Sequence, residues 1–153
     1  LSLRYRLGQW LSVGGTFNDI AAKDRERSLS ANSGQRSLHY NVRMPNMPYR
    51  YGTADVVLRW VGLGAPANTL TFTYNLNYQH EFPLYWENIG SADSKKRVPT
   101  QTAHDIALAY SIRGRYNFSI ECNNLTNEDL YDNYSLQKPG RAIYAKARVF
   151  FGK

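Results

Sequence analysis

The fold is decided by three stretches near the C-terminus, which read FSIECNNLTN (118–127), KPGR (138–141) and AIYAKARVFF (142–151). In the last stretch every second position from Ile143 to Phe151 is apolar, and three of the positions between hold Tyr144, Lys146 and Arg148. The first stretch begins with the same alternation. A period of two predicts strands with one apolar and one polar face. We therefore expect a strand, a long polar loop and a closing strand.

The same alternation recurs along the chain and predicts about seven strands. No segment shows convincing helical spacing, so the sequence predicts an all-β fold with antiparallel strands. The apolar positions expected to share one face are Leu1, Leu3, Tyr5 and Leu7; Leu11, Val13 and Phe17; Ala54, Val56, Leu58 and Trp60; Leu70, Phe72, Tyr74, Leu76 and Tyr78; Ile106, Leu108, Tyr110 and Ile112; Phe118, Ile120 and Cys122; and Ile143, Ala145, Ala147, Val149 and Phe151.

The predicted connections alternate in length. Short turns are expected near residues 8–9, 62–68 and 113–115, and long polar loops at about 19–51, 83–99 and 127–140. The strands are expected to hold about nine to eleven residues, which suits a tilted strand that spans a membrane. Aromatic residues make up 14% of the chain, and such barrels carry aromatic girdles. These features favour an antiparallel up-and-down transmembrane β-barrel segment of about seven strands, with short periplasmic turns and long extracellular loops.

Charge separates the two predicted faces. The apolar positions of the expected strands hold no charged residue. In a membrane barrel the polar face lines the lumen, and ion pairing is expected there between Glu121 and Lys146 or Arg148. The charges predicted on the polar face are Arg4, Arg6, Asp55, Arg59, Asp105, Glu121, Lys146 and Arg148.

Composition restricts the alternatives. The net charge is +7, but the basic residues are scattered and form no stripe, which disfavours nucleic-acid binding. Mean hydropathy is −0.54, and no apolar run is long enough for a transmembrane helix. The single cysteine excludes an internal disulfide. No signal peptide is present, so we expect the chain to come from a longer precursor.

The sequence offers little for catalysis. His39, His80 and His104 are widely separated and lack the spacing of metal ligands. No nucleophile elbow, zinc-protease motif or P-loop occurs. Asp105 and Glu121 are better explained by charge pairing with Lys146 and Arg148 than as a glycosidase pair. We therefore expect no catalytic, metal-binding or cofactor-binding residues, no cofactor, and a protein that is not an enzyme.

The order of NLTN, PGR and the alternating C-terminal strand resembles the end of TonB-dependent outer-membrane receptors. RVPTQTAHDI (97–106) is similar to the start of a late barrel strand in that family, and MPNMPY (44–49) resembles a junction in receptors of the Bacteroidetes type. The resemblance implies that residues 1–153 form the C-terminal portion of the barrel, without the plug domain and TonB box. A plugged barrel takes about 22 strands. The chain departs from the family by ending in Gly152 and Lys153.

The resemblance also implies a function and partners. A receptor of this kind lies in the outer membrane of a Gram-negative cell and imports a scarce nutrient such as a ferric siderophore, haem or cobalamin. The expected partners are TonB, the plug domain, outer-membrane lipid and a siderophore-like ligand. Val149 and Phe151 correspond to the C-terminal assembly signal. Arg4, Arg6, Arg59, Asp105, Glu121, Lys146 and Arg148 are the candidate lumen charges that face the plug or the ligand.

Two other classes remain open at the level of sequence. A small soluble ligand-binding β-barrel of the lipocalin type would turn its apolar face inward. A carbohydrate-binding β-sandwich or jelly roll is the other alternative. Both predict that the apolar positions are enclosed in a core.

Overall fold

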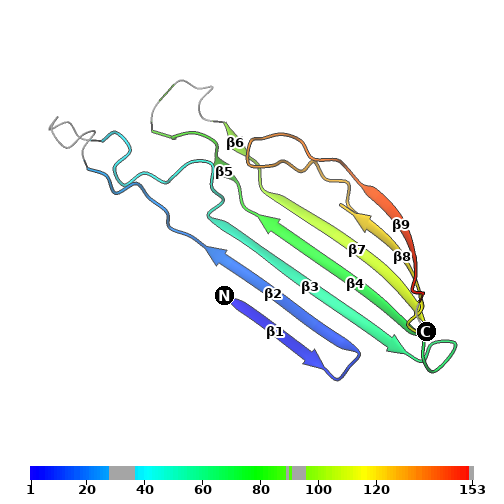
Figure 1. Ribbon diagram of the computed structural model, residues 1–153. Helices are drawn as coiled ribbons and strands as arrows, with labels where there is room; N and C mark the ends of the chain where they lie inside the picture. Colours follow the sequence, from blue (N-terminus) through cyan, green and yellow to red (C-terminus); the bar gives the residue numbers. More distant parts are fainter. Residues whose placement is uncertain (28–36, 89, 91–95, 152–153) are drawn as a thin grey trace.

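A computed structural model describes residues 1–27, 37–88, 90 and 96–151. The described residues form no helix, and seven strands lie in one antiparallel sheet, as predicted (Figure 1). Neighbours in the sheet follow chain order, so the topology is a meander. Its strands are β1 (Ser2–Leu7), β2 (Leu11–Asp19), β3 (Arg50–Val61), β4 (Thr69–Gln79), β7 (Gln101–Ile112), β8 (Tyr116–Asn123) and β9 (Ala142–Val149).

The connections lie at opposite ends of the sheet (Figure 1). Short turns at 8–10, 62–68 and 113–115 join β1 to β2, β3 to β4 and β7 to β8. Arg113 and Gly114 have φ values of 50° and 65°, which close the last of these turns. The three long connections follow β2, β4 and β8. We call the two ends the short-turn end and the long-loop end.

The register confirms that the predicted apolar positions within the strands share one face, whereas Leu1 and Phe151 lie outside the strands. One row runs across the sheet as Leu11, Leu58, Phe72, Leu108, Ile120 and Ala145, each opposite the next. On the same face, a row toward the long-loop end contains Val13, Val56 and Tyr74. A row toward the short-turn end contains Trp60, Tyr110 and Phe118. Side chains alternate between faces along a strand, so Thr73, Asn75, Asp105, Glu121 and Arg148 lie on the other face.

Several predicted boundaries are wrong in detail. β1 has 6 residues and β8 and β9 have 8 each, whereas β3 and β7 reach 12. β9 ends at Val149, and Phe151 lies beyond it with 95% of its surface exposed. β2 and β3 extend to Asp19 and Arg50, which therefore carry charge onto the apolar face at the long-loop end. Those two residues pair at 3.0 Å.

The loop expected at 83–99 contains structure that alternation does not predict. β5 (Phe82–Pro83) and β6 (Arg97–Val98) pair as a two-stranded ribbon. Phe82 and Val98 are fully buried there. The preceding loop joins this ribbon, since Asn46 donates its backbone N–H to the carbonyl of Pro83 at 2.7 Å. The ring of His39 also stacks on Trp86 at 4.0 Å. The described parts of the two loops therefore pack as one unit.

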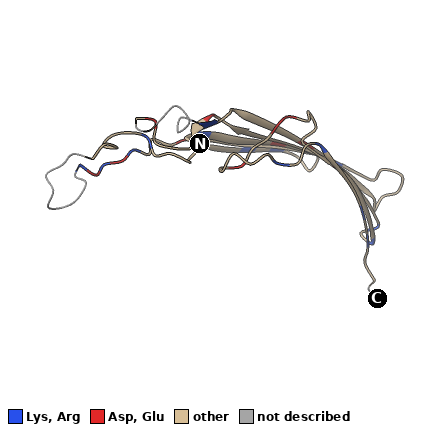
Figure 2. Cartoon of the chain, turned by 90° about the horizontal axis from the view of Figure 1, so that it is seen from above, with Lys and Arg blue, Asp and Glu red and all other residues tan. Residues whose placement is uncertain are grey.

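The sheet is a single curved layer (Figure 2), and it does not close into a barrel, because β1 and β9 form its two edges. Among the described residues the buried apolar side chains are Phe82, Pro83, Val98 and Cys122. On the apolar face Leu108 is 46% exposed and Ile120 59% exposed. No second layer covers this face within the described chain.

Candidate ligand-facing surface

Hollows lie on the polar face of the sheet. Three hollows of about 440, 350 and 410 Å³ are lined mainly by side chains of this face. The first and third lie at the short-turn end, and the second lies at the long-loop end. We call the first the basic hollow and the second the amide hollow.

Arg4 and Asp55 form an ion pair across an intervening strand. Arg4 lies opposite Gly14, and Gly14 lies opposite Asp55. The guanidinium donates two hydrogen bonds to the carboxylate at 2.9 and 3.1 Å. A Cβ on Gly14 would lie 2.6 Å from Asp55 Oδ1 and 2.8 Å from Arg4 Nη2. Because Gly14 has no side chain, the Arg4 and Asp55 side chains can meet above β2.

Glu121 pairs with Lys146, which confirms one of the two partners predicted for it. Lys146 Nζ donates to Glu121 Oε2 at 2.6 Å across β8 and β9. The Ser119 hydroxyl donates to the other carboxylate oxygen at 3.4 Å. Lys146 is 61% exposed, so the pair contributes only about 0–1 kcal/mol to stability.

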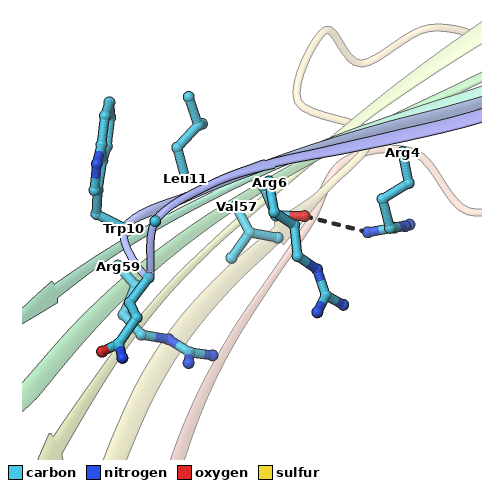
Figure 3. Close-up of a pocket in the computed structure, with 9 residues that line it drawn as sticks. Arg4, Arg6, Trp10, Leu11, Val57 and Arg59 are labelled. Atoms are coloured by element: carbon cyan, nitrogen blue, oxygen red, sulfur yellow. Dashed lines mark hydrogen bonds between the residues drawn. The ribbon is translucent and has the colours of Figure 1, made fainter.

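Three other basic residues of the polar face lack an acidic partner among the described residues. Within the described chain, Arg6, Arg59 and Arg148 form no ion pair. Arg6 and Arg59 line the basic hollow beside Arg4, where all three project from the same side of the ribbon, opposite Trp10 and Leu11 (Figure 3). Arg148 lines the third hollow beside Glu121 and Lys146. The sign imbalance predicted from the sequence is therefore concentrated at the short-turn end.

Asp105 does not act as a free charge. Its carboxylate accepts the backbone N–H of Asn124 at 2.8 Å. Asn124 is 4% exposed, and its side-chain amide exchanges two hydrogen bonds with the backbone of Glu128, at 2.8 and 3.0 Å. These hydrogen bonds of Asn124, in the NLTN segment, therefore fix the conformation at the start of the β8–β9 loop.

Gln101 makes a second clamp on the same loop. It is 6% exposed, and its amide donates to the carbonyl of Tyr131 at 3.0 Å and accepts the Tyr131 N–H at 2.6 Å. This clamp brings Leu130, Asn133 and Lys138 to the amide hollow. Sequence reasoning missed Gln101, because a polar residue at the start of a strand gives no signal of a partner thirty residues away.

Aromatic rings gather toward both ends of the apolar face. At the long-loop end the hydroxyl of Tyr78 lies 3.1 Å from Nδ1 of His80, and at mid-strand the hydroxyl of Tyr74 lies 2.8 Å from Nδ1 of His104. At the short-turn end Trp60, Tyr110 and Phe118 lie in one row. Tyr110 directs its hydroxyl to the 62–68 turn, where it donates to the carbonyl of Leu63 at 2.8 Å. The rings of Tyr78 and Tyr110 combine an apolar body with a hydroxyl directed toward a strand end.

The loop between β2 and β3 carries exposed basic and aromatic residues. Arg43 lies over the ring of Tyr49 at 3.9 Å. A hydrogen bond from Arg27 and its positive charge lower the pKa of the Tyr40 phenol. Part of this loop lies outside the described residues.

The described residues contain no group of three or more His, Cys, Asp or Glu side chains arranged to hold a metal ion. No helix in this part of the chain is long and apolar enough to cross a membrane. No protein-family model matches the chain, and comparisons with curated proteins and with solved structures find no significant match.

Proposed function

We propose that the chain is the C-terminal portion of the β-barrel of a TonB-dependent receptor in the outer membrane of a Gram-negative cell. The observation that carries the proposal is the continuous apolar face of a single-layer meander, which nothing in the described chain covers. Soluble proteins rarely expose apolar patches larger than a few hundred Å². Contact with lipid would keep an apolar face of this size out of water.

The dimensions of the central strands support a membrane environment. β3, β4 and β7 hold 12, 11 and 12 residues, so each spans roughly 36 Å at about 3.3 Å per residue. With a tilt of about 40°, that length reaches roughly 28 Å across a membrane, enough for an apolar band about 25 Å tall. Aromatic rings toward both ends of the apolar face agree with the girdles of such barrels.

The open edges require further strands. Unpaired backbone groups at β1 and β9 are costly in lipid, so only closed sheets span membranes. In the proposed receptor the remaining strands of the barrel pair with these edges. A lipocalin-type barrel or a β-sandwich would enclose the apolar face, and no observation favours either class.

The proposed mechanism involves no covalent chemistry. The long loops capture a scarce nutrient outside the cell, the polar face lines the lumen, and TonB drives a rearrangement of the plug that admits the ligand. Arg6, Arg59 and Arg148 have no acidic partner within the described chain. In this proposal their charges face acidic residues of the plug or an anionic chelate such as a ferric siderophore.

The full-length precursor provides the test. Expressed in a Gram-negative host, it should fractionate with the outer membrane and support nutrient uptake that stops when TonB is deleted. Recovery of the folded protein in the periplasm as a soluble species would refute the proposal. Uptake that persists without TonB would be compatible with an outer-membrane barrel but would refute TonB as its energy source.

A further inference from the structure

The amide hollow differs chemically from the basic hollow. It measures about 350 Å³ and lies at the long-loop end, between β3, β4, β7 and the β8–β9 loop. Its polar lining consists largely of neutral side chains, including Tyr51, Asn77, Gln79 and Asn133. Of the described residues that line it, Lys138 alone is charged and none is a carboxylate.

The wall formed by the β8–β9 loop is held in place by the buried amide of Gln101 and by hydrogen bonds within the loop. The Gln101 clamp fixes Tyr131 by two hydrogen bonds. Within the loop, Asp132 accepts the N–H groups of Tyr134 and Leu136 at 2.8 and 2.9 Å. The Lys138 N–H donates to the carbonyl of Leu130 at 2.7 Å. A wall fixed in this way loses little conformational freedom when a ligand enters, which favours binding.

The lining has unused hydrogen-bonding capacity. The side chains of Tyr51, Asn77 and Asn133 form no hydrogen bond with any other described residue. Gln79 Nε2 is buried and has no hydrogen-bond partner among the described residues. A buried donor without a partner is costly, and a ligand oxygen that reached it would remove that cost.

The geometry points to a ligand with an uncharged, hydroxyl-rich unit, and we propose that the amide hollow binds a neutral sugar residue of the imported nutrient. Each side-chain amide offers a donor and an acceptor side by side, which matches neighbouring hydroxyls that both donate and accept. Tyr51 adds aromatic surface for the apolar face of a sugar ring. This inference rests on the proposed receptor function and specifies its ligand.

The test uses the purified full-length receptor in lipid nanodiscs and an array of neutral and acidic oligosaccharides. We expect binding to at least one neutral series. Asn77→Leu and Gln79→Ala should each weaken that binding about tenfold, the loss expected for one or two neutral hydrogen bonds. Asn75→Leu is the matched control, because Asn75 lies on the same strand and face one pair away and outside the hollow.

The outcomes separate the two proposals. A receptor that resides in the outer membrane and imports an anionic ferric chelate, but binds no neutral oligosaccharide, overturns the sugar site and leaves the receptor function intact. Equal losses for Asn77→Leu and Asn75→Leu also overturn it. Heat-modifiable migration on gels confirms that each variant is folded, and Gln79→Ala provides a second variant if Asn77→Leu does not fold. Failure to reach the outer membrane refutes the receptor function itself.

Discussion

Two glycines in neighbouring strands meet different surroundings. A Cβ on Gly14 would press on the ends of the Arg4 and Asp55 side chains, at 2.8 and 2.6 Å. A Cβ on Gly52 would lie 2.6 Å from the backbone oxygen of Thr16. Side-chain ends rotate away at low cost, whereas a strand backbone in a ladder has nowhere to move. The two positions therefore differ in tolerance although both are glycines in strands.

We predict that Gly52→Ala destabilises the full-length receptor by about 1–3 kcal/mol, as overpacking does. Gly14→Ala should change stability by less than about 1 kcal/mol. It loses an exposed ion pair worth about 0–1 kcal/mol and gains the conformational advantage of alanine over glycine, about 0.5–1 kcal/mol. Urea unfolding in bilayers measures both. A larger loss at Gly14 than at Gly52 would contradict this account.

At the scale of the strand, the pairing register gives β7 and β4 one apolar and one polar side. Leu108 lies opposite Phe72 and Ile120 on the apolar face, and Thr73 lies opposite Ala107 on the polar face. Under the proposed function the first face meets lipid and the second meets the lumen. Charge is costly on the lipid side alone.

Leu108→Arg is therefore expected to destabilise the intact receptor by roughly 2–4 kcal/mol, the cost of a charge near the bilayer midplane. Thr73→Arg introduces the same side chain on the other face and should cost much less. Denaturant titration of both variants refolded into lipid bilayers makes the comparison. Equal losses would show that the two faces do not differ in environment.

The loop after β8 is held in part by the buried amide of Gln101. Gln101 is 6% exposed and holds the Tyr131 backbone by two hydrogen bonds. Gln101→Leu leaves that backbone donor and acceptor without partners, at a cost of about 1–3 kcal/mol. We expect faster amide exchange throughout 130–138 and unchanged exchange in the 62–68 turn. If exchange in the loop stays at the wild-type rate, Gln101 does not position it.

How far the sequence predicts these elements depends on the range of the interactions. Alternation gave the seven strands and their faces, because a period of two records which side of a strand meets the apolar environment. The β5–β6 ribbon has two residues per strand, too few for any period. The Gln101 and Asn124 clamps depend on contacts made only after the loop folds back. The sequence analysis assigned Asp19 and Arg50 to a loop, because charged residues at these positions break the apolar alternation. In the structure the two side chains form an ion pair, and both residues belong to strands.

The whole sheet has a chemical gradient along its polar face. The short-turn end holds Arg6, Arg59 and Arg148 without acidic partners in the described chain, and the long-loop end holds the largely neutral amide hollow. If the amide hollow binds a neutral sugar, the ligand does not neutralise the arginines. In that case we expect the plug, which fills the lumen of the proposed receptor, to supply acidic partners for the arginines.

Charge reversal tests this assignment in the full-length receptor. Arg59→Glu should repel an acidic plug surface and reduce the hydrogen-exchange protection of the plug, and Arg59→Gln should have a smaller effect. Salt should reduce the difference between the two variants, because exposed charges are screened beyond about 8 Å at physiological ionic strength. An alternative outcome, normal plug protection with slower, salt-dependent uptake of an anionic ferric chelate, would assign the arginines to the ligand through focusing of the field in the lumen. Wild-type values of plug protection, uptake and salt dependence would mean that water alone solvates these charges and that they have no partner in transport.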